Sequence, residues 1–151
     1  MASKPETHTR IVRMKRLERG VLDYLLREAG EQDPRPNAGF FKDPKNVLLV
    51  AYTDGQLSGF LWAHILDSPH TPDPKVLLYS IDVLGPFRRR GIATRLIRYL
   101  KEIARTCGCR GMFVPTSKSN LAAVALYQTT GGIAKNDDDV VFVYEQEALS
   151  T

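Results

Sequence analysis

The residues of this chain with the clearest capacity for chemistry lie where an extended apolar run meets a helical pattern. The run over residues 76–83 ends at a Gly85-Pro86 turn, and three arginines and a glycine at 88–91 precede the helical pattern. Backbone N–H groups of a glycine-containing loop and of a helix N-terminus attract anions, and arginine side chains add positive charge. The segment predicts a phosphate or pyrophosphate site. The alternative is a solvated arginine cluster on an ordinary strand–turn–helix.

Two motifs together resemble those of the GCN5-related N-acetyltransferases. Residues 88–93, RRRGIA, fit the Arg/Gln-x-x-Gly-x-Gly/Ala loop that binds acetyl-CoA in that family. Residues 120–127, NLAAVALY, fit its downstream element Asn-x-x-Ala-x-x-Leu-Tyr. The resemblance covers roughly residues 8–147 and implies acetyl-CoA as co-substrate, transfer of its acetyl group to an amine, and no metal.

The resemblance also implies how the coenzyme binds. Two parallel strands, one ending at Val83 and one beginning near Met112, splay apart and admit the pantetheine arm, while loop N–H groups hold the pyrophosphate. The Val83 N–H is expected to polarise the acetyl carbonyl and stabilise an oxyanion. The coenzyme-binding residues implied in this way are Val83, Arg88, Arg89, Arg90, Gly91, Ile92, Ala93, Thr94, Asn120, Ala123 and Tyr127.

Tyr127 is the predicted general acid. Asn120, Ala123 and Tyr127 have the i, i+3, i+7 spacing of one helix face, and the small Ala123 leaves room for the pantetheine arm. A phenol held there can protonate the thiolate that leaves when the amine attacks the thioester. Two alternatives stay open: a half-buried packing residue, and a residue that mainly orients the coenzyme.

Asp82 is the predicted general base for the substrate amine. A carboxylate inside an apolar run is costly unless it is partnered or exposed to a ligand. It would accept the proton directly or through water, or simply bind the substrate ammonium, and the alternative is a strand-end aspartate bonded to a loop. Glu145 is a second candidate for gripping or deprotonating the amine, and His64 and His70 are weaker ones.

A closer resemblance, to the aminoglycoside 3-N-acetyltransferases, concerns the acceptor. It rests on Tyr79-x-x-Asp82, the doubled arginine, Gly-Ile-Ala-Thr at 91–94, and Ala-Val-Ala-Leu-Tyr-x-x-x-Gly at 123–131. It implies acetylation of an aminoglycoside, with antibiotic resistance as the result and Tyr79, Asp82 and Glu145 contacting the drug. Carboxylates suit such a polycation. A polyamine, a small metabolite, a protein amine, or a non-enzymatic acyl-CoA-binding role stays open.

Charge and composition narrow the class of protein. Residues 84–110 hold eight Lys/Arg against one Glu, and residues 130–151 hold five acids against one Lys, as a phosphorylated coenzyme and a cationic substrate would require. The alternative is that both segments form solvated surface faces that bind no partner.

The aromatic content of the basic segment argues against a nucleic-acid-binding protein, because only Phe87 and Tyr99 are interleaved with its basic residues. The opening MASKPETHTR lacks the apolar centre of a secretory signal, and no run approaches a membrane span, so we expect a cytoplasmic protein with reduced Cys107 and Cys109. Family members are often dimers, which leaves a homodimer open.

The elements that must position these residues follow from hydrophobic periodicity and turn signals. Besides the strands and helices given next, a single helical turn is predicted around Phe40 and Phe41. The predicted strands are residues 9–14, 46–52, 57–66, 75–83, 111–115 and 140–145, and the predicted helices are 17–29, 92–107 and 120–129. This order predicts one domain over residues 1–151 with an α/β (α+β) fold: a single mixed, mostly antiparallel central sheet with splayed parallel central strands and helices on both faces.

Overall fold

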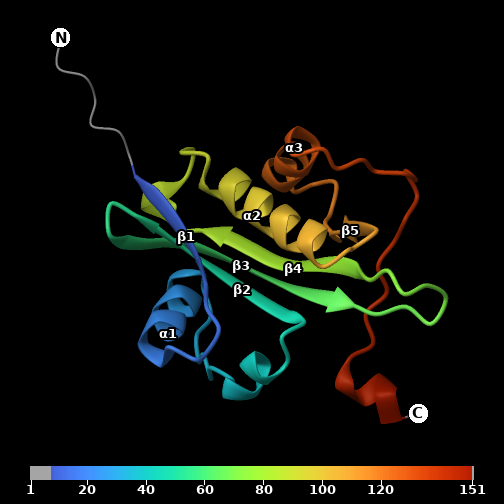
Figure 1. The fold of residues 1–151 in the computed structure, drawn as a ribbon, viewed down its shortest axis with the longest axis horizontal. Coiled ribbons are helices and arrows are strands. Elements are labelled where there is room, and N and C mark those ends of the chain that lie inside the picture. Colours follow the sequence, from blue (N-terminus) through green and yellow to red (C-terminus); the bar gives the residue numbers. More distant parts are fainter. Residues whose placement is uncertain (1–7, 151) are drawn as a thin grey trace. The chain divides into compact units, whose positions relative to one another are not determined.

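The computed structural model describes residues 8–150, so most of the opening segment considered above lies outside the described residues. The chain divides into two compact units, the first ending at Val114 and the second beginning at Pro115. The first unit holds a five-stranded sheet and two α-helices, and the second holds one α-helix (Figure 1). Among the described residues, no helix has the length and apolar character needed to cross a membrane.

The sheet has the strand order β1-β2-β3-β4-β5. The first four strands are antiparallel, and β5 runs parallel to β4. Asp54 and Gly55 join β2 to β3 with positive φ values of 50° and 81°, the conformation of a two-residue hairpin turn. The strands are β1 (Thr9–Arg13), β2 (Asn46–Thr53), β3 (Gln56–Leu66), β4 (Lys75–Val83) and β5 (Gly111–Phe113).

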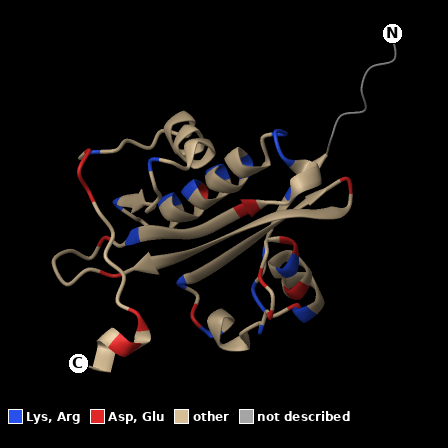
Figure 2. Ribbon diagram, turned by 180° about the vertical axis from the view of Figure 1, so that it is seen from behind, with Lys and Arg blue, Asp and Glu red and all other residues tan. Residues whose placement is uncertain are grey.

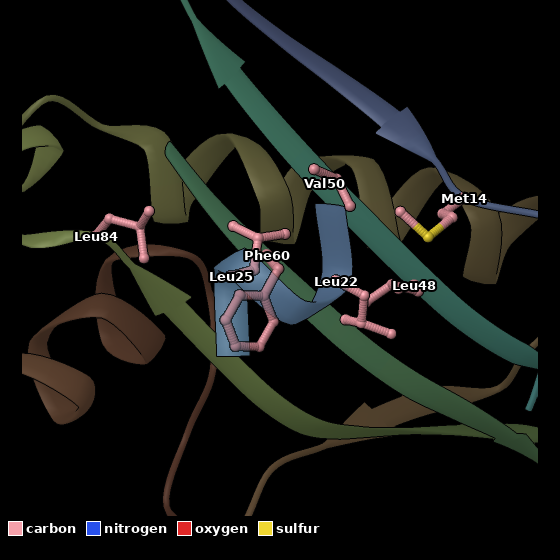
Figure 3. Close-up of a cluster of buried hydrophobic side chains, with 7 residues drawn as sticks. All are labelled: Met14, Leu22, Leu25, Leu48, Val50, Phe60 and Leu84. Atoms are coloured by element: carbon pink, nitrogen blue, oxygen red, sulfur yellow. The ribbon is translucent and has the colours of Figure 1, made fainter. Parts of the chain in front are cut away.

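Helices α1 (Arg19–Glu28) and α2 (Ile92–Thr106) cover opposite faces of the sheet (Figure 1). On the α1 face, Leu22 and Leu25 belong to a buried cluster with side chains from β2 and β3 (Figure 3). Because side chains alternate along a strand, the neighbouring residues of β2 and β3 face α2. The α2 residues buried on that side are Ile92, Leu96, Ile97 and Leu100. The predicted fold class is confirmed.

Short 3-10 helices connect these elements. Residues Ala38–Lys42 form η1, which confirms the turn predicted around Phe40 and Phe41, and the Asn37 side chain accepts a hydrogen bond from the Gly39 N–H. Residues Gly85–Phe87 form η2 directly after β4. Both cysteines are free thiols, as expected.

The second unit corrects one prediction. Its helix α3 (Leu121–Thr129) is close to expectation, but residues 140–145 form no strand and lead instead into the 3-10 helix η3 (Gln146–Ser150). Residues 140–144 are 68–80% exposed despite their β-branched and aromatic composition. Such composition favours a pleated, half-buried surface, and without a paired neighbour it does not produce a strand. As a consequence, β5 is an edge strand of the described sheet and not a central one.

Candidate active site

The parallel strands β4 and β5 are paired over only part of their length. Pairing runs from Lys75 opposite Gly111 to Leu77 opposite Phe113, where β5 ends. Strand β4 continues through residues 78–83 with β3 alone as its partner, up to the pair Gly59 and Val83. One edge of the last six residues of β4 is therefore not paired with β5, as the prediction of two separating strands requires.

The Val83 N–H points toward this unpaired edge. The Leu84 N–H donates to the Ser58 carbonyl at 2.9 Å, on the β3 side. Successive N–H groups of a strand alternate in direction, so that of Val83 is directed away from β3. The Val83 carbonyl lies on the same side and accepts a hydrogen bond from Arg88 Nε at 3.0 Å. The predicted donor to the acetyl carbonyl thus has a suitable backbone orientation.

Gly59 is a residue of this region that sequence reasoning missed. A Cβ at this position would lie 2.8 Å from the Asp82 carbonyl oxygen and 3.3 Å from Val83 Cα. Only glycine lets β3 and β4 approach so closely where β4 ends. A glycine inside an otherwise apolar strand is a signal for such an approach, and Gly59 in β3 carries it.

The basic loop has the geometry of an anion-binding concavity. Arg89 and Gly91 both have left-handed backbone conformations, with φ values of 64° and 76°. The hydrogen bond from the Arg95 N–H to the Gly91 carbonyl opens α2, so the amides of residues 92–94 precede it and lack intrahelical acceptors. No side chain caps this helix end. Backbone N–H groups gathered in this way suit a phosphate, which fits the predicted roles of Arg89, Gly91, Ile92, Ala93 and Thr94.

The arginine side chains of this loop contact the protein itself. Arg88 Nη2 lies 3.7 Å from Asp82 Oδ1, in addition to its bond to Val83. The Arg90 guanidinium lies 5.7 Å from the centre of the Phe87 ring, a cation–π distance. Arg88 and Arg90 therefore support the strand end and the turn, which sequence reasoning did not anticipate.

The basic charge is also more dispersed than expected. Figure 2 shows Lys and Arg along α2 as well as in the loop before it. A groove of about 670 Å³ between α2 and β1 is lined by basic residues that do not include the loop arginines, and these are Arg10, Arg95, Arg98, Lys101 and Arg105. The cluster read from residues 84–110 is therefore not a single patch.

Asp82 lies on the sheet face that carries Phe60, its cross-strand partner. Its side chain is 30% exposed and has the Arg88 guanidinium beside it. Because the Arg88 guanidinium already lies beside this carboxylate, an ammonium group that bound Asp82 would compete with Arg88. Tyr79 lies on the same face, 62% exposed, and its ring stacks on Trp62 with centroids 5.4 Å apart. Trp62 was missed by sequence reasoning.

The second unit carries the remaining predicted residues. A phenol is protonated at neutral pH, as a proton donor must be, and burial raises the pKa of Tyr127 further. Ala123 and Tyr127 are one turn apart on α3, whereas Asn120 is the N-cap of that helix and accepts from the Ala123 N–H at 3.2 Å. Glu145 follows the irregular segment, and its carbonyl accepts from Ala148 N–H. Within residues 8–150, no three His, Cys, Asp or Glu side chains gather as metal ligands.

A match to a protein-family model shows the family of this chain. Residues 14–131 match the acetyltransferase (GNAT) family, and this range includes β4, the loop, α2 and α3. The chain belongs to the GNAT family. The matched range crosses the boundary between the two compact units, so the family sequence pattern includes parts of both.

Two relatives of this chain are named as N-acetyltransferases. The chain is 32% identical over 82 residues to human (Homo sapiens) N-acetyltransferase 8, covering 54% of the chain and 36% of that protein. It is 34% identical over 85 residues to aminoglycoside N(6')-acetyltransferase type 1 of Salmonella typhimurium (strain LT2), covering 54% of the chain and 59% of that protein. The chain thus spans between about a third and three fifths of the length of these relatives.

A solved structure extends the similarity to most of the fold. The structure of AAC(6')-Iy in complex with the bisubstrate analog CoA-S-monomethyl-acetylneamine superimposes with a TM-score of 0.75 and 26% identity. The superposition covers 90% of this chain and 97% of that one.

Proposed function

We propose that this protein is an acetyl-CoA-dependent N-acetyltransferase that acetylates an amino group of an aminoglycoside. The observation that carries the proposal is the end of β4, where the Val83 N–H is directed to an edge that β5 does not pair, next to Asp82 and the N–H-rich loop. Both compact units would act together as one transferase domain, since the family model spans their boundary.

The chemistry assigned to the chain follows from these groups. Acetyl-CoA supplies the acetyl group, and the amides of the loop and the start of α2, with Gly91 at their centre, bind its diphosphate. The Val83 N–H donates to the acetyl carbonyl oxygen and stabilises the charge that develops there. Asp82 binds the substrate ammonium and accepts its proton, directly or through water, and Tyr127 donates a proton to the leaving sulfur. No metal takes part in this scheme.

Two lines support an aminoglycoside acceptor. A relative and a similar solved protein, AAC(6')-Iy, are named as aminoglycoside acetyltransferases. Tyr79 and Asp82 share one face of β4, and Glu145 is proposed as a further acid for the drug. The motifs around Tyr79 and Asp82 favour the 3-amino group, while those proteins are named for the 6'-amino group. We retain the 3-amino group as the prediction, with resistance in the cytoplasm as its consequence, and the 6'-amino group as the alternative.

A thiol-release assay with acetyl-CoA and a panel of amines tests the proposal. We expect turnover with kanamycin and gentamicin, followed by product analysis to identify the acetylated nitrogen. Turnover only with polyamines or peptide amines would overturn the acceptor. Binding of CoA without turnover on any amine would instead identify an acyl-CoA-binding module. Drug susceptibility of cells expressing the chain tests the resistance role.

A further inference from the structure

We propose that the β3–β4 face carrying Trp62 and Tyr79 holds the acceptor molecule, and that it selects a saturated ring bearing ammonium groups over a linear polyamine. This inference rests on the proposed function and concerns the first unit alone. It adds Trp62, whose ring stacks on Tyr79, as a specificity-determining residue.

The aromatic side chains on this face form a continuous series. Trp62 stacks nearly parallel to Tyr79, at 16° between planes, and to Phe60, with centroids 6.0 Å apart. The His64 and Tyr79 rings form a T-shaped pair with centroids 5.8 Å apart, and the Phe40 and His64 rings form another with centroids 5.9 Å apart. The series therefore runs across β3 and β4 from the buried Phe60 to η1.

Hydrogen bonds fix the orientation of this surface. The Asn46 side-chain amide donates to the Phe40 carbonyl at 2.9 Å, so its Oδ1 is the atom that lies 2.9 Å from His64 Nδ1. Because Oδ1 only accepts, His64 Nδ1 carries the hydrogen. His64 is thus held in one ring orientation and one tautomer where it contacts the Tyr79 ring. A preorganised aromatic surface loses little side-chain entropy when a ligand binds.

The strand register brings the carboxylate to the same surface. Phe60 pairs with Asp82 and Trp62 pairs with Ser80, and an irregularity after Trp62 accommodates Tyr79. Asp82 is three positions after Tyr79, a distance of about 10 Å at most along β4. A ligand that stacks on the aromatic rings can therefore place an ammonium at Asp82, which lies one residue from the Val83 N–H.

The exposure of Tyr79 points to a ligand. Its side chain is 62% exposed, and it lies just past Leu77, where the pairing of β4 with β5 ends. Aromatic faces bind the apolar C–H faces of saturated rings and attract cations. A linear polyamine satisfies the carboxylate but covers little ring surface. The combination of stacked rings and one carboxylate thus favours a cyclic amine such as an aminoglycoside sugar.

Trp62 allows a direct test, because it is the single tryptophan of the chain. We expect kanamycin to change the selectively excited tryptophan emission saturably, and spermidine to change it far less. Tyr79→Ala should raise the kanamycin Kd and KM by about 3- to 30-fold, leaving the KM for acetyl-CoA unchanged. The matched control is Tyr99→Ala, an exposed tyrosine on α2, which should leave all of these values unchanged.

The outcomes separate this inference from the proposed function. Turnover of kanamycin with an unchanged tryptophan signal and a wild-type KM in Tyr79→Ala would overturn the inference while the transferase stands. Equal responses to spermidine and kanamycin would overturn the preference for a ring. A tryptophan response to kanamycin without any turnover would support the surface and overturn the transferase.

Discussion

Gly59→Ala tests the close approach of β3 and β4 beside the proposed acetyl-transfer edge. The new Cβ would lie 2.8 Å from the Asp82 carbonyl oxygen and 3.3 Å from Val83 Cα, and both of these atoms belong to the backbone. A flexible side chain can rotate away from such a contact, but here the end of β4 must shift. Overpacking of this kind costs roughly 1–3 kcal/mol, against a gain below about 1 kcal/mol from reduced unfolded-state entropy.

The shift would also displace the Val83 N–H and Asp82 from their working positions. Because a misplacement of about 1 Å can cost on the order of 100-fold in rate, we expect turnover to fall by at least tenfold. Urea denaturation measures the stability change, and thiol release under conditions where the variant is folded measures the rate. Binding of CoA to the loop should be affected less than turnover.

Gly111→Ala is the matched control for this experiment. Gly111 also lies in a strand, β5, but a Cβ there would have no heavy atom within 4 Å. We expect unchanged or slightly raised stability and wild-type turnover. If Gly59→Ala is as stable and as active as Gly111→Ala, then the contact at β4 does not constrain the site and the reasoning fails.

Three further predictions concern single side chains. Tyr127→Phe should lower turnover with little change in acetyl-CoA affinity, and an unchanged rate would remove the acid role. Because burial raises the pKa of the Tyr127 phenol above the ordinary tyrosine value of 10.0, any loss of rate due to its ionisation should begin above pH 10.0. A loss that began at lower pH would also remove the acid role. Asp82→Ala should sharply reduce turnover or amine affinity, and wild-type kinetics would discard the base assignment. Thr53→Val should lower the free energy of unfolding, measured by urea denaturation, by about 1–3 kcal/mol. The reason is that the Thr53 hydroxyl is hydrogen-bonded to the buried hydroxyls of Thr9 at 3.0 Å and Ser58 at 2.9 Å. An unchanged free energy of unfolding would show that these bonds do not contribute to stability.

Local signals in the sequence were sufficient for most elements of the first unit. The bounds of β4 were predicted as the structure has them, and α2 differs by one residue at its end. Both depend on short-range information: an apolar run stopped by Gly85-Pro86, and a helical stripe stopped near Gly108. The loop from Arg88 to Gly91 was predicted for the same reason, because glycine and the helix start determine where free N–H groups gather.

The prediction at residues 140–145 was wrong because a strand is not a local structure. A helix satisfies its hydrogen bonds within the segment, whereas a strand needs a neighbour to accept and donate. The composition of these residues expressed a preference for a paired, half-buried surface, and the described structure provides no such partner. The sequence of residues 140–145 therefore indicates a preference for β structure but does not specify a strand with which they pair.

By itself, the sequence determined the family, the loop proposed to bind an anion, and the candidate residues Asp82 and Tyr127. The tertiary structure alone decided which groups meet on the sheet. The register across β3 and β4, including its irregularity after Trp62, set Trp62 beside Tyr79 and Asp82 beside Phe60. The conformation of the turn after β4 also brought the Arg88 side chain to Val83 and Asp82. The contacts across β3 and β4 depend on pairing between two strands joined by a loop, and no spacing along one strand encodes that register.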